Sequence, residues 1–292
     1  MKNLSNYILE AKTKIQHIDI RQPKSRSELE ILISGAFKRK QYDLNFIDTS
    51  KITDMSELFE GVKHNFDVSS WDVSNVKDMS KMFSRCYAFT GKGLGNWDVS
   101  SVKDMSYMFT DCFKFNCDLS NWDVSNVTDM SHMFDSCSIF IGKGLENWDV
   151  SNVTNMYSMF LHCKKFDCDL SNWDMSNVID TSLMFSNCAK FTGKGIENWN
   201  VSKVKSMYAM FGDCTNFNCD VSNWDVSNVT DMDSMFVNCK KFTGKGLENW
   251  NVSKVKTMRT MFNGCKFNYH ELDWDLSGLS SQLKTFRNYL AD

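Results

Sequence analysis

The chain has 292 residues, enough for two ordinary domains, with 33 lysines and arginines against 36 aspartates and glutamates. The net charge of −3 gives no global attraction to nucleic acid or to an anionic membrane. No apolar run approaches the roughly 18 residues of a membrane span, and residues 1–16 lack the apolar stretch of a secretory signal. We therefore expect no signal peptide and no membrane insertion, and a cytoplasmic or virion-associated protein; surface display stays open.

Residues 1–50 are expected to form an N-terminal helical cap. Ser27 followed by Glu30 has the pattern of a capping box. An apolar stripe at helical spacing follows this start: Leu29, Leu32, Ile33 and Phe37. Pro23, the only proline, falls in the link between the two helices predicted here. Such a terminal unit would cover the first coil and block edge-to-edge growth.

Residues 51–275 repeat themselves in about nine coils marked by tryptophan. The marking residues are Trp71, Trp97, Trp122, Trp148, Trp173, Trp199, Trp224, Trp250 and Trp274. Coils of 25 and 26 residues alternate, so two coils make a 51-residue superunit. The longer coil enters through Gly-Lys-Gly and the shorter through a segment such as FNCDLSNW. A fixed short period predicts one elongated domain in which each coil packs on its neighbours.

Each coil combines two spacings of apolar residues. Trp122 and Val124 alternate as in a short strand, with both side chains pointing inward. Met130, Met133, Phe134 and Cys137 then follow at the spacing of one inward stripe of a two-turn helix. The fold class we predict is therefore an α/β repeat, a leucine-rich-repeat-like parallel solenoid with one short strand and one short helix per coil. On this interpretation the methionine pairs belong to the core.

The residue before each first methionine, or before its substitute Thr181, is expected to be the N-cap of that short helix. All nine carry a side chain that accepts a hydrogen bond: Asp54, Asp78, Asp104, Asp129, Asn155, Asp180, Ser206, Asp231 and Thr257. A catalytic or metal-binding carboxylate row would not substitute serine and threonine so freely. Capping is the better explanation.

The repeat V-x-x-M-x-x-M-F-x-x-C-x-x-F followed by L-x-x-W-x-V resembles that of BspA-like leucine-rich-repeat surface proteins, the bacterial surface protein 26-residue repeat. The resemblance covers about residues 50–275. It implies a leucine-rich-repeat-type solenoid found in bacterial surface and adhesion proteins, some of which bind extracellular or host proteins. The chain departs from that family in having no visible export signal or anchor.

Eight of the eleven cysteines occupy one column of the repeat: Cys86, Cys112, Cys137, Cys163, Cys188, Cys214, Cys239 and Cys265. Cys117, Cys168 and Cys219 recur every 51 residues, two coils or roughly 10 Å apart, which is too far for disulfide bonds among them. We expect buried, reduced thiols, with these three partly accessible beside a turn.

The Gly-Lys-Gly loops carry Lys92, Lys143, Lys194 and Lys245. They lack the spacing of a phosphate-binding loop, so they are interpreted as turns with two positive φ angles. The shorter coils place Asp118, Asp169 and Asp220 near the equivalent turn, which predicts an alternating lysine and aspartate stripe.

The candidate protein-binding site is the residue between the inward tryptophan and the inward valine. This column, the aspartate ladder, comprises Asp72, Asp98, Asp123, Asp149, Asp174, Asn200, Asp225, Asn251 and Asp275. Stacked about 4.8 Å apart on a concave sheet, its carboxylates should repel one another unless a basic partner, cations or hydrogen bonds offset them. The alternative is that each aspartate accepts bonds from nearby serine hydroxyl or turn N–H groups.

A second row of charge, the lysine rim, follows the cysteine column: Lys114, Lys164, Lys165, Lys190, Lys240, Lys241 and Lys266. We interpret it as a solvated edge rather than a specific nucleic-acid site. The five histidines share no column, and no catalytic, cofactor or metal constellation is visible. No enzyme activity is expected.

Residues 276–292 are expected to form a C-terminal helical cap through Leu279, Leu283, Phe286 and Leu290. The function predicted from the sequence is a non-enzymatic protein-binding module used in adhesion, host interaction or assembly. The alternative is a structural or decoration subunit of a phage virion or another large assembly, attached through residues 1–50. The sequence does not identify the partner.

Overall fold

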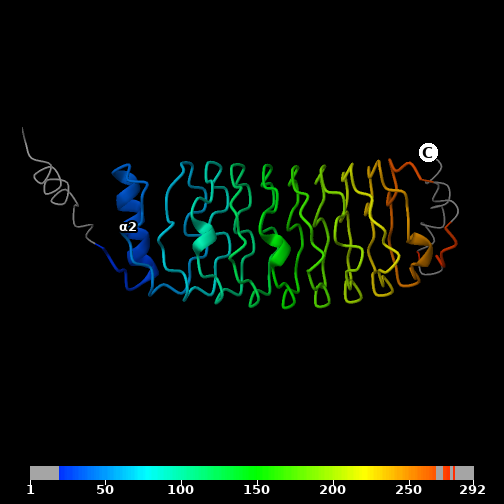
Figure 1. Ribbon diagram of the computed structural model, residues 1–292, viewed down its shortest axis with the longest axis horizontal. Helices are drawn as coiled ribbons and strands as arrows, with labels where there is room; N and C mark the ends of the chain where they lie inside the picture. The colour runs from blue at the N-terminus through cyan, green and yellow to red at the C-terminus, as the bar shows by residue number, and fades with distance from the viewer. Residues whose placement is uncertain (1–19, 268–271, 277–278, 280–292) are drawn as a thin grey trace, which may run out of the picture.

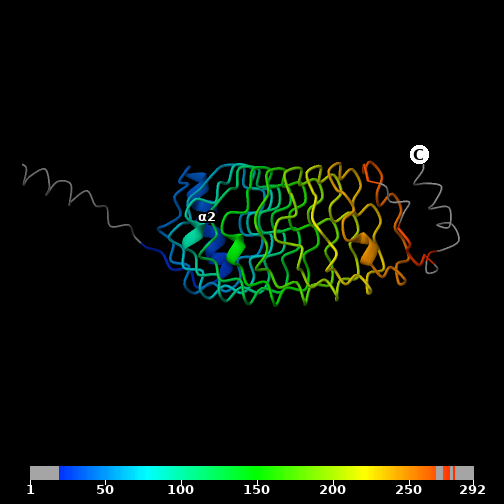
Figure 2. The ribbon, with the colours of Figure 1, turned by 45° about the vertical axis from the view of Figure 1, so that its right-hand side comes forward.

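The computed structural model describes residues 20–267, 272–276 and 279. The chain winds as a stack of similar coils along one nearly straight axis, with helix α2 (Arg26–Lys38) at the N-terminal end (Figures 1 and 2). Isolated parallel bridges join each coil to the next, from Asp54 with Asp78 as far as Asp231 with Thr257. The predicted parallel repeat solenoid is confirmed. Because the axis is nearly straight, the aspartate ladder runs along a flank and not inside a horseshoe.

The register of the coils extends back beyond the first tryptophan. Ile47 stands where later coils have tryptophan, and Asp43 bridges Asp67 of the following coil. Arg21 in turn forms a parallel bridge with Ile47. The coil column therefore begins within the segment that the sequence suggested as a cap.

Besides α2, the regular elements of the described residues are three 3₁₀ helices at the entry of longer coils. These are η1 (Leu94–Asn96), η2 (Leu145–Asn147) and η3 (Leu247–Asn249). The second glycine of Gly-Lys-Gly precedes each of them, and Gly144 has φ of 95°. A Cβ on Gly144 would lie 2.6 Å from the carbonyl carbon of Leu119. The two positive φ angles predicted for these loops are confirmed.

The strand and the helix predicted for every coil do not form in the described coils. Between Met130 and Cys137 the chain makes consecutive turns, with φ of 54° at His132 and 62° at Ser136. A positive φ at the third residue of a turn is typical of type II turns and ends any α-helix. The apolar spacing predicted burial correctly, because these turns also direct the residues at that spacing inward.

Hydrogen bonding explains why turns replace the helix. The N–H groups of Met130, His132, Phe134 and Ser136 donate to carbonyls of the next coil at 2.7–3.1 Å. The N–H groups of Met133, Asp135 and Cys137 each donate to the carbonyl three residues earlier in the chain. The N–H group of Ser131 donates to the side-chain carboxylate of Asp129. An isolated eight-residue helix would leave its first four N–H groups without partners, whereas here all eight are bonded.

The column expected to cap these helices forms side-chain turns instead. Asp129 Oδ1 accepts from the N–H of Ser131 at 2.8 Å, and Asn155 and Asp180 accept likewise from the residue two positions on. The prediction of a hydrogen-bond acceptor was correct, and the prediction of a helix N-cap was wrong. In the last coil Thr257 instead contacts the carboxylate of Asp233.

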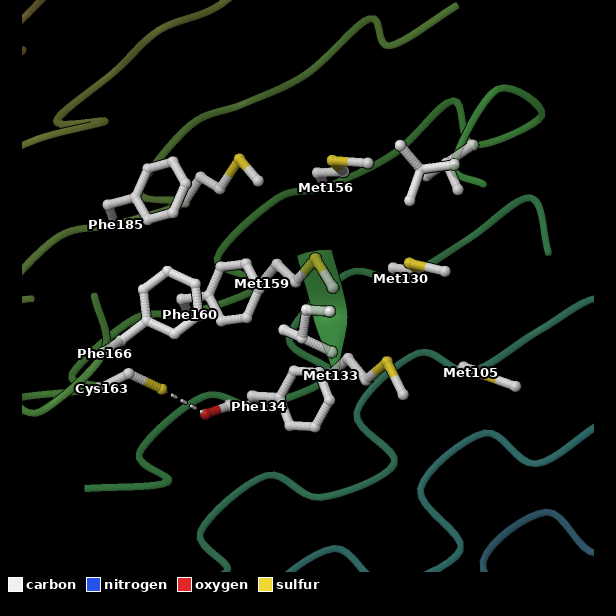
Figure 3. Close-up of a cluster of buried hydrophobic side chains, with 14 of the residues drawn as sticks. Met105, Met130, Met133, Phe134, Met156, Met159, Phe160, Cys163, Phe166 and Phe185 are labelled. Atoms are coloured by element: carbon white, nitrogen blue, oxygen red, sulfur yellow. Dashed lines mark hydrogen bonds between the residues drawn. The ribbon is translucent and has the colours of Figure 1, made fainter. Parts of the chain in front are cut away.

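The core is a set of ladders, and one apolar residue type predominates in most columns (Figure 3). Phenylalanine rings of neighbouring coils stack nearly parallel, as in Phe134 on Phe160 at 5.7 Å and 3°. The methionines beside them, including Met133 and Met159, are fully buried, as predicted. Each indole N–H donates to a carbonyl of the preceding coil, for example Trp122 to Leu94 at 2.8 Å. Every coil is thereby tied to the next through its interior.

The cysteine column is part of this core. The Cys163 thiol donates to the Phe134 carbonyl at 3.0 Å (Figure 3), and the other seven members bond to the equivalent phenylalanine. Seven of the eight are fully buried, and Cys265 is half-buried. Cys168 and Cys219 are also buried, so of the three cysteines expected to be accessible only Cys117 is partly exposed.

Helix α2 closes the N-terminal end, but its cap lies two residues earlier than predicted. Ser25, not Ser27, accepts from the N–H of Glu28, whose carboxylate accepts from the N–H of Lys24. The buried face of α2 consists of Leu29, Ile33 and Ala36. Leu283, Phe286 and Leu290 of the predicted C-terminal cap lie outside the described residues, whereas Leu279 is described and buried.

Candidate functional site

The aspartate ladder is exposed along the whole stack, one side chain per coil. Each carboxylate or amide from position 72 to 251 accepts from the backbone N–H of the serine two residues on, at 2.9–3.2 Å. This is the internal hydrogen bonding that the sequence offered as an alternative to a binding role. It orients every ladder side chain in the same way and leaves its second oxygen or its amide group directed away from that bond.

The same bonds affect the acidity of the ladder. The serine hydroxyl and then the serine N–H hold the pKa of Asp98 and Asp149 below the ordinary value. For Asp225 the neighbouring Lys254 lowers the pKa further. These carboxylates therefore stay charged near neutral pH although they are stacked coil on coil. The arrangement is a preorganised row of acceptors with negative charge.

The alternating stripe of lysine and aspartate at the coil entries is present as predicted. Lys143 pairs with Asp118 at 2.7 Å, and the equivalent pairs are Lys194 with Asp169 and Lys245 with Asp220. The hydrogen bond from Lys143, followed by that from Ser120, lowers the pKa of Asp118 to about 2. These loops neutralise their own charge, so they are poor candidates for a phosphate-binding site.

The lysine rim differs from that stripe in its lack of internal partners. All seven side chains are exposed. Among the residues that the structure describes, none of the seven forms an ion pair. The rim follows the ladder by about 15 residues in each 25- or 26-residue coil, more than halfway round. The rod therefore carries uncompensated positive charge on a different flank from its row of carboxylates.

Sequence reasoning missed one polar cluster that the stacking of coils creates. Asp135 lies between two histidines, 3.1 Å from His132 Nδ1 and 3.7 Å from His162 Nδ1. The histidines belong to different columns, so no periodicity in the sequence pairs them. Within the described ranges no group of three histidine, cysteine or acidic side chains is arranged to hold a metal ion. In the same part of the chain no helix is long and apolar enough to cross a membrane.

Comparison with known proteins places the repeat in a family. A search of curated proteins found no match. A solved structure, "Crystal structure of TLR13-ssRNA13 complex", aligns with 13% identity and a TM-score of 0.26 over 82% of this chain. The alignment covers 43% of that structure's chain, and at this TM-score it carries no argument about fold or ligand. One family model matches residues 28–143, 117–194 and 184–291. The chain therefore belongs to the family described as "Mycoplasma protein of unknown function, DUF285".

Proposed function

We propose that the chain is a non-enzymatic protein-binding repeat module whose contact surface is the aspartate ladder. The observation that carries the proposal is a regular row of exposed, similarly oriented carboxylates on a rigid stack. Side chains already fixed by hydrogen bonds lose little conformational freedom on binding. The resemblance to BspA-like leucine-rich-repeat surface proteins supports the same class of function, in adhesion, host interaction or assembly.

The expected partner is a protein with a basic surface. The ladder residues of three consecutive coils, Asp123, Asp149 and Asp174, form its central acidic block. Nine coils span only about 40 Å at roughly 4.8 Å per coil, which suits a standard interface of about 800 Å² per partner. Charge complementarity of this kind mainly increases the association rate, which then falls with added salt.

The test uses a substitution that the chain already tolerates. Asn200 and Asn251 hold their serine N–H groups at 3.2 and 3.1 Å as the aspartates do, so Asp→Asn removes charge and keeps the turn. The triple variant D123N/D149N/D174N should lose capture of the native partner in a pull-down, and charge reversal to lysine should abolish capture. The matched control is D118N/D169N/D220N on the coil entries. Unchanged capture by both ladder variants would exclude this surface.

A structural or decoration subunit of a virion or other assembly is the second candidate. It is favoured by the N-terminal end, where Ile31 on α2 is 70% exposed and Ile20 is 66% exposed. A neighbouring groove is lined by apolar side chains, including Ile33, Phe37 and Leu58, together with polar side chains of α2. Deleting residues 1–20 should then prevent incorporation into particles while the solenoid stays folded. A full-length chain that is monomeric and never associates with particles would contradict this candidate.

A further inference from the structure

A hollow of about 350 Å³ opens on the rim of the stack beside the cysteine column. It is lined by Phe113, Ser136, Ser138, His162, Lys164 and Asn187, which come from four consecutive coils. Each lining residue directly precedes or follows a cysteine of the column. In the coil of Cys137 both flanking residues are serines, whereas the coil before offers Phe113 and the coil after offers His162 and Lys164. Two small residues between larger neighbours therefore create the depression.

The lining of the hollow is rich in hydrogen-bond donors. In the described structure the side chains of Ser138, Lys164 and Asn187 have no hydrogen-bond or ionic partner, and His162 uses only Nδ1. Lys164 supplies a full positive charge, Ser138 supplies a hydroxyl and Asn187 supplies an amide. Nε2 of His162 donates only in the protonated imidazole, because Nδ1 faces the Asp135 carboxylate. Donors that line one hollow together with a cation and lack internal partners favour an oxyanion.

Two carboxylates lie near the hollow without lining it. Asp135 is held by His132 Nδ1 at 3.1 Å, by His162 Nδ1 at 3.7 Å and by the Ser136 hydroxyl at 3.0 Å. Asp111 is partly buried, and its burial, followed by its closeness to Asp135, raises its pKa. Neither carboxylate is itself part of the lining, but both interact with lining residues, because Asp135 contacts Ser136 and His162 and Asp111 interacts with the same two side chains. Lys164 is the only lysine or arginine among the lining residues.

One wall of the hollow is an aromatic ring. Phe113 is 42% exposed and stacks on Tyr87 of the preceding coil, with ring centroids 5.3 Å apart and planes within 9°. Because Tyr87 covers one face of the Phe113 ring, the opposite face is directed along the axis toward the coil of Ser138. A planar group beside the oxyanion would stack on that face.

We propose that this hollow binds a phosphate or sulfate monoester carried on a planar ring. The oxyanion is held by Lys164, Asn187 and Ser138, and the ring lies on Phe113. This ligand site is independent of the aspartate ladder. Its position on the lysine rim also gives an anionic ligand a favourable approach.

Titration calorimetry with four small probes tests the site: phenyl phosphate, phenyl sulfate, phenol and inorganic phosphate. Phenyl phosphate or phenyl sulfate should bind, and the stronger of the two shows whether the site prefers a phosphate or a sulfate ester. Phenol should show no binding, and inorganic phosphate should bind more weakly than phenyl phosphate. Equal binding of phenol and both esters, or no binding of either ester, would overturn the proposal.

Variants separate the hollow from the general charge of the rim. K164M should weaken ester binding about tenfold or more, because a charge-assisted hydrogen bond is lost. Its matched control is K240M, which removes a lysine from the same column in another coil and should leave binding unchanged. F113A should weaken phenyl phosphate but not inorganic phosphate, and S138L should fill the hollow and abolish binding of both. If K164M and K240M weakened ester binding equally, the binding would be a non-specific attraction to the lysine rim, and the proposed site would be excluded.

Discussion

Asp118 and Lys143 show how single residues secure the entry of a coil. The pair spans two coils at 2.7 Å, and the serine two residues on completes the bonding of the carboxylate. Both side chains are well exposed, so the pair fixes geometry more than it adds stability. The sequence predicted this contact because the two residues occupy the same turn in alternating coils.

The acidity of Asp118 gives a direct test of that contact. Its pKa of about 2 lies below the ordinary value, so the stabilising bond is present above about pH 4 and is lost as the pH falls toward 2. Carboxyl carbon NMR titration should find this low value in the native chain. In K143M the pKa should rise toward the ordinary range while Asp169 keeps its value. An unchanged Asp118 titration in K143M would show that the pair does not persist in solution.

The cysteines give a second test at this scale. Burial raises the pKa of Cys86 to about 12, and that of Cys137 rises well above its ordinary value for the same reason. Thiolates are the reactive form, so most thiols should resist labelling in the folded state. The half-buried Cys117 and Cys265 should react first, and all eleven should react after unfolding under non-reducing conditions. If fewer than eleven thiols reacted after unfolding, some cysteines would be oxidised, which would favour an exported, surface-type protein.

At the scale of elements, the sequence predicted which side chains are buried better than it predicted the local backbone. The spacing of Met130, Met133, Phe134 and Cys137 fits a helix, and all four are buried. The same spacing also fits a run of turns that repeats every four residues, with positive φ at His132 and Ser136. Whether the backbone forms a helix or turns depends on the carbonyl acceptors that the next coil supplies. The spacing of apolar residues within one coil gives no information about those acceptors. The hollow escaped prediction for the same reason, although aligning the coils on cysteine would have exposed its two serines.

Helix α2 offers a clear comparison between the predicted and the observed cap. S25A should lower the free energy of unfolding by about 1 kcal/mol, because the N–H of Glu28 loses its acceptor. S27A, at the position that the sequence suggested, should change it by no more than about 0.5 kcal/mol, since Ser27 is exposed and makes no cap bond. Urea unfolding of both variants measures the difference. A larger decrease in the free energy of unfolding for S27A than for S25A would show that Ser27 is the N-cap, as predicted from the sequence.

The whole molecule behaves as a one-dimensional array, because each coil is bonded to its neighbours through backbone, indole and thiol groups. Its length is therefore adjustable in units that preserve the alternation of long and short coils. The 51-residue superunit is such a unit. A single coil is not, because removing one places two like entries side by side and breaks the lysine and aspartate stripe.

Excision of residues 123–173 should leave a folded, shorter rod. Its urea m-value should fall roughly in proportion to the length removed, because m follows the surface exposed on unfolding. Excision of residues 123–148, which removes one coil, should cost more stability per residue. Circular dichroism during urea titration measures both. Greater destabilisation per residue by the 51-residue excision would contradict the array description.

The hydrogen bonds between coils also give the rod an electrical direction. In each turn-forming segment four alternate N–H groups point toward the C-terminal end, and the carbonyls that accept them point toward the N-terminal end. Aligned peptide dipoles add, as they do along a helix, so the N-terminal end of the stack carries partial negative charge. Arg26 of α2 sits at that end, where its guanidinium donates to the carbonyl of Ser56 and to the carboxylate of Asp54. The helical cap thus places a cation at the negative pole of a macrodipole that runs through the described coils.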